Sequence, residues 1–136
     1  MAPPMRYGMP SESKLRVGLV QMAMASDQSD NLRKAVRMVE EAARRGARVV
    51  CLPELFTTPY FPREEDPEGG RERGALLNTI PGLVTETLSD LAMRTGTVVI
   101  GGSIYEAADS GLYNTATVHE ADGRLLGRYR KLHIPH

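Results

Sequence analysis

Apolar and polar positions follow two different periods along the chain, and each period predicts a different element. In residues 14–22 the apolar side chains first alternate, at Leu15, Val17 and Leu19, and Val20 and Met22 then follow, which predicts a strand buried on at least one face. In residues 30–45 they recur every three or four positions, with charged residues on the other face, as in an amphipathic helix. Asp30 is a good N-cap residue and Gly46 stands where a C-terminal cap belongs. The apolar run 47–52 then predicts a second strand.

A strand, a helix and a strand in close succession form a βαβ unit, which requires parallel strands and a right-handed crossover. The pattern continues with a helix that Pro81 and Gly82 open and Gly96 ends, followed by an apolar strand over residues 97–101. Three more strands are expected over residues 103–106, 112–120 and 124–130. Asp122 and Gly123 predict a hairpin turn between the last two. The chain is therefore expected to be of the α/β class.

One carboxylate stands where a predicted strand ends. Pro53 cannot donate to a sheet ladder, so Glu54 should lie just past the carboxyl end of strand 47–52, where open α/β sheets bind ligands. Between Leu52 and Leu55 the carboxylate is expected to be partly desolvated, with its pKa raised towards neutrality as a general base requires. The alternative is a loop glutamate that caps a backbone amide or pairs with an arginine, and this stretch alone favours that alternative.

Other candidate side chains have equally plain structural interpretations. Cys51 lies inside an apolar strand, so we expect a buried and inert thiol rather than a reactive one. Lys131 follows the last strand and could stabilise an oxyanion or simply be solvated. His133 is isolated, which favours a local hydrogen bond over a general base or a metal ligand. Tyr60, in the long segment 57–74, could wall a pocket or pin that segment to the core.

Composition excludes several classes of partner. Lys+Arg and Asp+Glu both number 17 among 136 residues, so nothing in the charge points to nucleic acid or an anionic membrane. A single cysteine excludes an internal disulfide framework and fits a reducing compartment such as the cytoplasm. No metal-ligand spacing, GxGxxG motif, Walker loop or GxSxG elbow is present.

Residues 1–13 are expected to be a flexible leader, and residues 14–136 to be one domain or a piece of one.

An ordered set of motifs resembles the N-terminal half of the nitrilase, or carbon–nitrogen hydrolase, superfamily. The motifs are VGLVQM, a helix that begins with DNL, LPELF, GGSIYE, and YNTATV followed by DGRLLGRYRKLH. LPELF and YRKLH, in this order and at this separation, are a specific signal, and the resemblance covers residues 14–134. The stretch ELFTTPYF looks closest to the branch that cleaves N-carbamoyl amines, such as the N-carbamoylputrescine amidohydrolases of polyamine metabolism.

The resemblance implies a four-layer α-β-β-α sandwich and a Glu-Lys-Cys mechanism without a metal or organic cofactor. Glu54 matches the family's general base, and Lys131 matches the lysine that stabilises the tetrahedral intermediate. From its place in the long segment, and not from the resemblance, Tyr60 is a candidate substrate-binding residue. The implied substrate is a small amide or N-carbamoyl amine, and the complete domain is expected to be a homo-oligomer.

The chain also departs from the family's pattern. The nucleophilic cysteine of the family lies beyond the lysine, at a turn that this chain does not contain, and Cys51 precedes the glutamate and does not match it. We therefore expect a partial domain that is inactive alone. Two alternatives stay open: a non-catalytic remnant or partner subunit, and a transferase in which another nucleophile intercepts the thioester.

Overall fold

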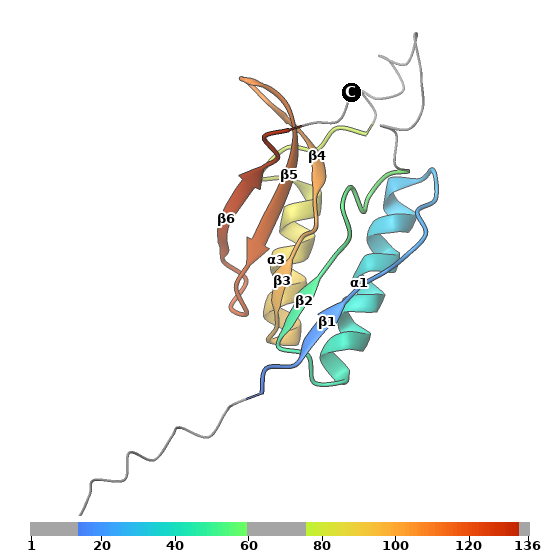
Figure 1. The fold of residues 1–136 in the computed structure, drawn as a ribbon, viewed down its shortest axis with the longest axis vertical. Helices are drawn as coiled ribbons and strands as arrows, with labels where there is room; N and C mark the ends of the chain where they lie inside the picture. The colour runs from blue at the N-terminus through green and yellow to red at the C-terminus, as the bar shows by residue number, and fades with distance from the viewer. Residues whose placement is uncertain (1–13, 60–75, 134–136) are drawn as a thin grey trace, which may run out of the picture.

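The computed structural model describes residues 14–59 and 76–133. The elements are, in order, β1 (Val17–Leu19), α1 (Gln28–Arg44), β2 (Val49–Cys51), α3 (Leu83–Thr95), β3 (Val98–Ile100), β4 (Ile104–Ala108), β5 (Gly111–His119) and β6 (Leu125–Arg130) (Figure 1). This order is the predicted one. The expected leader, residues 1–13, and most of the expected long segment lie outside the described residues.

All the strands belong to one six-stranded sheet. β1, β2 and β3 are parallel neighbours, and β5 is antiparallel to β3, β4 and β6. Thr115 of β5 pairs with Ile104 on one side and with Arg130 on the other, and Val118 likewise pairs with Ile100 and Gly127. β3 and β4 therefore follow one another along one edge of β5, and β6 occupies the other edge. Consequently β6 runs parallel to β1–β3 and ends at the same end of the sheet as they do.

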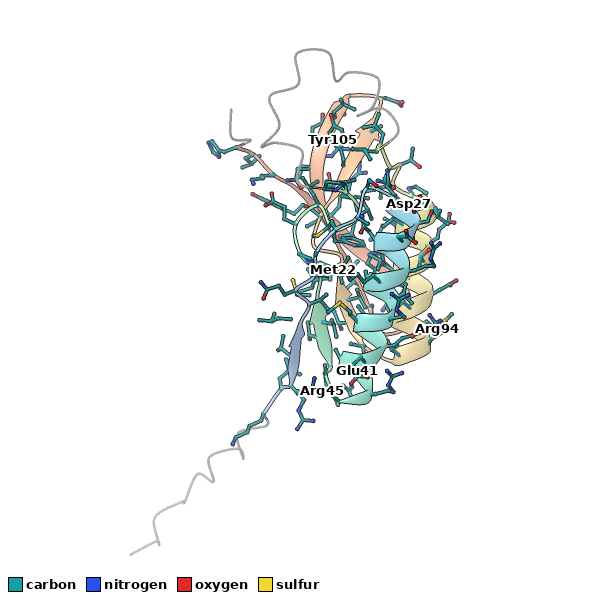
Figure 2. The ribbon with its side chains drawn as sticks, turned by 90° about the vertical axis from the view of Figure 1, so that its right-hand side faces the viewer. Met22, Asp27, Glu41, Arg45, Arg94 and Tyr105 are labelled. Carbon is teal, nitrogen blue, oxygen red and sulfur yellow. The ribbon has the colours of Figure 1, made fainter. Side chains whose placement is uncertain are left out.

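Both helices cover one face of the sheet (Figures 1 and 2). The core between these two layers consists mainly of aliphatic side chains, among them the fully buried Val39, Val50, Leu88, Leu91 and Val99. Gly18 allows α1 to approach β1 closely, because a Cβ there would lie 2.9 Å from the Cβ of Ala42. Within the described ranges, no helix has the length and apolarity needed to cross a membrane.

The helix caps match the prediction except at the N-terminus of α1. Asp27, not Asp30, is the N-cap of α1, and its carboxylate accepts the Asp30 N–H at 2.9 Å. Both residues suit a cap, and the expectation for Asp30 was wrong because the earlier aspartate already has the extended backbone that a cap requires. At the other end Gly46 has a positive φ of 87° directly after the C-cap Arg45, and Gly96 caps α3 with a φ of 61°.

The second face of the sheet carries apolar side chains that no described element covers. Because Gly18 points to α1, Val17 and Leu19 point away from it, and Leu19 is 82% exposed. Tyr129 pairs with Ala116 on the same face and is 61% exposed. The helices and the sheet thus form two of the four layers of an α-β-β-α sandwich.

Candidate active site

The segment that carries Glu54 is fastened to the segment that follows β3. The Leu55 N–H donates to Ser103 Oγ at 2.9 Å, and the Phe56 N–H donates to the Ser103 carbonyl at 3.2 Å. The side chains of Leu55 and Phe56 are buried, whereas Glu54 is exposed. Leu55 reaches this arrangement with a positive φ of 50°, which is uncommon for a residue other than glycine. The chain therefore anchors its apolar residues in the core and turns Glu54 outward.

Gly102 makes this close approach possible. Its φ is +26°, and a Cβ at this position would lie 2.0 Å from the carbonyl oxygen of Pro53 and 2.4 Å from that of Leu52. No larger residue fits between these two backbones without moving one of them. The glycine in the GGS motif therefore determines how the loop with Glu54 sits against the end of β3.

Glu54 and Lys131 form an ion pair at the carboxyl ends of β2 and β6. Lys131 Nζ lies 2.8 Å from Glu54 Oε1. The two side chains are 35% and 41% exposed, so the pair is open to solvent on one side. The predicted proximity of these two residues at one end of the sheet is confirmed.

Asn114 of β5 contacts both members of this pair. Its side-chain amide donates from Nδ2 to Glu54 Oε1 at 2.8 Å, and its backbone carbonyl accepts the Lys131 N–H at 2.9 Å. Oε1 thus receives both side-chain hydrogen bonds, one from Lys131 and one from Asn114. In the part of the chain that the structure describes, Oε2 of Glu54 receives none.

These contacts change the expected charge state of the carboxylate. The hydrogen bond from Lys131, with smaller contributions from Asn114 and from the lysine charge, lowers the pKa of Glu54 below its ordinary value of 4.5 and outweighs the opposite effect of burial. The expectation of a pKa raised towards neutrality was therefore wrong, because an exposed carboxylate with two donors is stabilised in its charged form. Glu54 is ionised at neutral pH and can accept a proton.

An open cavity of about 430 Å³ lies beside this pair on the uncovered face of the sheet. Its lining combines the polar groups at the strand ends with apolar strand residues: Cys51, Leu52, Glu54, Gly102, Ser103, Asn114, Ala116, Tyr129 and Lys131. Cys51 was expected to be buried, but it is partly exposed here, and its thiol donates weakly to the Leu52 carbonyl at 3.5 Å. The reason is that residues 49 and 51 alternate with Val50, which packs under α1.

A second polar cluster fixes β6 from the side of the helices. The Glu106 carboxylate is 1% exposed and accepts hydrogen bonds from Arg128, from Thr115 and, through both of its oxygens, from Arg130. The Arg130 hydrogen bond is the main cause that lowers the pKa of Glu106, so this buried carboxyl is charged. The Arg130 guanidinium also stacks on Tyr113, 3.8 Å from the ring centre. Arg130 and Lys131 are adjacent, so this cluster holds the strand end from which Lys131 projects.

Two further candidates came from the sequence, Tyr60 and His133. Tyr60 lies outside the described residues. His133 is exposed at the end of the described chain. Within residues 14–59 and 76–133, no group of three or more His, Cys, Asp or Glu side chains is arranged to hold a metal ion.

Two residues with specific polar contacts near the site, Asn114 and Glu106, were not predicted from the sequence. Asparagine and glutamate are both depleted in strands, yet each stands within a predicted strand segment. A polar side chain in such a position usually has a specific hydrogen-bond partner. An asparagine or a glutamate inside a predicted strand is therefore a sequence signal for such a contact.

Comparisons with known proteins concern the family and the fold of the chain. The sequence profile described as carbon-nitrogen hydrolase matches residues 16–136. Omega-amidase NIT2-B of Xenopus laevis is 41% identical over 122 residues, and omega-amidase NIT2 of Homo sapiens is 38% identical over 122 residues. Each alignment covers 90% of this chain and 41% of the relative, so the chain spans less than half the length of these curated relatives.

Solved structures give the same result for the fold. The carbon-nitrogen hydrolase of Helicobacter pylori G27 superposes with a TM-score of 0.71 at 28% identity, covering 89% of this chain and 40% of that chain. Nit3 of Saccharomyces cerevisiae, a member of branch 10 of the nitrilase superfamily, superposes with a TM-score of 0.72 at 29% identity, covering 88% and 44%. Both of the curated relatives named above are omega-amidases, which does not support the expected resemblance to N-carbamoylputrescine amidohydrolases.

Proposed function

Because this chain belongs to the carbon–nitrogen hydrolase family, we propose that it forms the part of an amidase that supplies the general base, Glu54, and the oxyanion-stabilising cation, Lys131. The observation that carries the proposal is the 2.8 Å contact between Lys131 Nζ and Glu54 Oε1 at the edge of an open cavity. A carboxylate and an ammonium group side by side can serve acyl transfer, since one accepts a proton while the other offsets negative charge on the carbonyl oxygen.

The reaction would proceed through a thioester. A cysteine thiol, supplied by a part of the family domain that this chain does not span, loses its proton to Glu54 as its sulfur bonds to the amide carbon. Lys131 stabilises the oxygen that becomes negative in the tetrahedral intermediate. The carbon–nitrogen bond then breaks, and the proton held by Glu54 leaves with the ammonia. Water deprotonated by Glu54 finally hydrolyses the thioester and restores the thiol.

The ionised state of Glu54 supports this sequence of steps. Its lowered pKa keeps it charged at neutral pH, so the base is ready before the substrate arrives. Oε1 is held by Lys131 and Asn114, which leaves Oε2 as the oxygen that takes the thiol proton. The cavity wall formed by Ala116 and Tyr129 gives the carbon chain of a substrate an apolar surface.

For the substrate class, the relatives favour a carboxamide at the end of a carbon chain over an N-carbamoyl amine, since those relatives carry the name omega-amidase.

The activity test requires a protein in which this chain is joined to the rest of a family domain, here called the complete-domain protein. It is assayed for ammonia release from a linear ω-amide, a simple aliphatic amide and N-carbamoylputrescine.

We expect the highest kcat/KM for the ω-amide. Equal or faster turnover of N-carbamoylputrescine would overturn the substrate assignment and leave the amidase proposal standing. Absence of ammonia release from all three compounds, in a folded protein, would overturn the amidase proposal.

A further inference from the structure

Asn114 links the two proposed catalytic residues. Its side chain donates to Glu54 Oε1 at 2.8 Å, and its main chain accepts from the Lys131 N–H at 2.9 Å. Glu54 follows β2, and Lys131 follows β6, so the two residues come from separate strands that are not neighbours in the sheet. Asn114 lies in β5, between them, and is bonded to both.

The two hydrogen bonds of Asn114 depend on different parts of the residue, one on its main chain and one on its side chain. Any amino acid at position 114 would offer a carbonyl to Lys131, because that bond continues the β5–β6 ladder one residue beyond the Thr115–Arg130 pair. The bond to Glu54 requires a side-chain N–H donor of this length. A carboxylate only accepts hydrogen bonds, so the asparagine must present its NH₂ group to Glu54. The side-chain contribution can therefore be removed without removing the main-chain one.

Glu54 needs a second anchor because it is 41% exposed. A single bond to Lys131 would leave the carboxylate free to rotate about its terminal torsion, which is broad for glutamate. With Lys131 and Asn114 both on Oε1, the plane of the carboxylate is fixed. The other groups that line the cavity are Cys51, Ser103 and Tyr129 together with apolar residues, and Lys131 is the one charged side chain that faces Glu54 among the described residues.

We propose that Asn114 is a positioning residue of this site, whose side-chain amide holds Oε1 of Glu54 so that Oε2 is aimed at the attacking thiol. The inference rests on the proposed function, since it assigns a role relative to Glu54 as the base. Asn114 does not touch the reacting atoms; it acts through the glutamate. Displacing a catalytic group by about 1 Å can cost on the order of 10²-fold in rate.

The test uses the complete-domain protein with Asn114→Ala and Asn114→Asp. For Asn114→Ala we expect kcat to fall about 10²-fold with KM almost unchanged, and the acid limb of the kcat/KM profile to move to higher pH. The limb moves because one of the hydrogen bonds that favour ionised Glu54 is lost. Asn114→Asp should move the limb further, because a carboxylate now faces a carboxylate.

Thr115→Val is the control for a merely structural effect on β5. It removes the hydrogen bond from Thr115 to Glu106 on the opposite face of the same strand and leaves the bond to Glu54 in place. This variant should be less stable but keep the wild-type acid limb. A wild-type kcat and acid limb in Asn114→Ala, or the same shift in Thr115→Val, would overturn the positioning role.

The Glu54→Gln variant distinguishes a failure of the positioning role of Asn114 from a failure of the proposed function. If Glu54→Gln abolishes turnover while Asn114→Ala keeps the wild-type rate and profile, the positioning role fails and the proposed function stands. If Glu54→Gln turns over at the wild-type rate, the assignment of the base fails, and the role of Asn114 fails with it.

Discussion

Glu54 Oε1 and Lys131 Nζ lie 2.8 Å apart although 77 positions separate the two residues in the sequence. The sheet topology brings them together: β2 and β6 are both parallel to β3, so their carboxyl ends lie at one end of the sheet. The close approach of the Glu54 loop to Gly102 and Ser103, and the hydrogen bond between Lys131 and Asn114 that continues the β5–β6 ladder, then set the position of each side chain. The pair is a product of the fold and not of local sequence.

The isolated 136-residue chain is expected to release no ammonia from ω-amides or N-carbamoyl amines. A base and an oxyanion partner without a nucleophile cannot form the thioester, and removal of the nucleophile typically costs about 10³-fold or more. Cys51 provides the sharpest check, because it lines the same cavity as Glu54 and Lys131. The chain and its Cys51→Ser variant are assayed side by side. Turnover by the chain that disappears in Cys51→Ser would identify Cys51 as the nucleophile.

Gly102→Ala should disrupt the site through its backbone. The new Cβ would meet the Pro53 carbonyl at 2.0 Å, so either the loop with Glu54 or the end of β3 must move. Gly96→Ala is the comparison, because Gly96 also has a positive φ but no atom within 4 Å of an added Cβ. In the complete-domain protein, chemical denaturation should show the free energy of unfolding falling by about 1 kcal/mol for Gly96→Ala and by clearly more for Gly102→Ala, whose kcat should also be reduced. Equal losses in the two variants would contradict the clash.

His119 should make stability depend on pH. Its ring is buried, with Nδ1 2.9 Å from Ser89 Oγ and Nε2 3.0 Å from Thr117 Oγ1, and burial lowers its pKa below the ordinary value of 6.5. The folded state therefore favours the neutral ring. This contribution is complete above pH 6.5 and is lost as the pH falls from 6.5 towards the folded pKa.

The measurement is the free energy of unfolding of the complete-domain protein at about pH 7.5 and about pH 5.5. The protein with His119 should lose up to about 1.4 kcal/mol more over this interval than His119→Gln, since the lower pH is about one unit below the unfolded pKa. His133→Gln is the matched control, because it makes the same substitution at an exposed histidine. An unchanged pH dependence in His119→Gln would contradict the account of the buried ring.

The uncovered face of the sheet should make the isolated chain self-associate. Leu19 and Tyr129 expose most of their surface on this face, and contiguous exposed apolar patches favour association. Light scattering at micromolar concentration should detect oligomers, and Leu19→Lys should reduce them. Leu83→Lys serves as the control, because Leu83 is 73% exposed but lies at the start of α3, which covers the other face. A monomeric, cooperatively unfolding chain would contradict this prediction.

Much of the fold was accessible from the sequence because local signals agree with the tertiary structure. The strands and both helices appear in the predicted order, Gly96 caps α3, and the Glu120–Gly123 turn closes with a hydrogen bond of 2.8 Å from the Gly123 N–H. Glu54 and Lys131 were identified through a family resemblance, and the structure places them in contact. Their catalytic roles stay predictions, as do the oligomeric state and the cytoplasmic location.

The properties that the sequence did not reveal depend on contacts between distant segments. The pKa of Glu54 was assigned the wrong direction because its donors, Lys131 and Asn114, come from strands 60 or more positions away. The partial exposure of Cys51 follows from which face of β2 packs under α1, and an apolar run of three residues does not reveal that face. The sequence also did not show that Asp27 and not Asp30 is the N-cap of α1, since the two aspartates stand three positions apart and both residues suit a cap.

The most direct test of the central claim is the rate of ammonia release by the complete-domain protein with Glu54→Gln and with Lys131→Ala. Each variant should lose about 10³-fold or more in kcat. Glu41→Gln, which breaks the exposed Glu41–Arg44 ion pair on α1, and Cys51→Ser should keep the wild-type rate. Wild-type turnover in Glu54→Gln or in Lys131→Ala would show that the Glu54–Lys131 pair is not the catalytic centre.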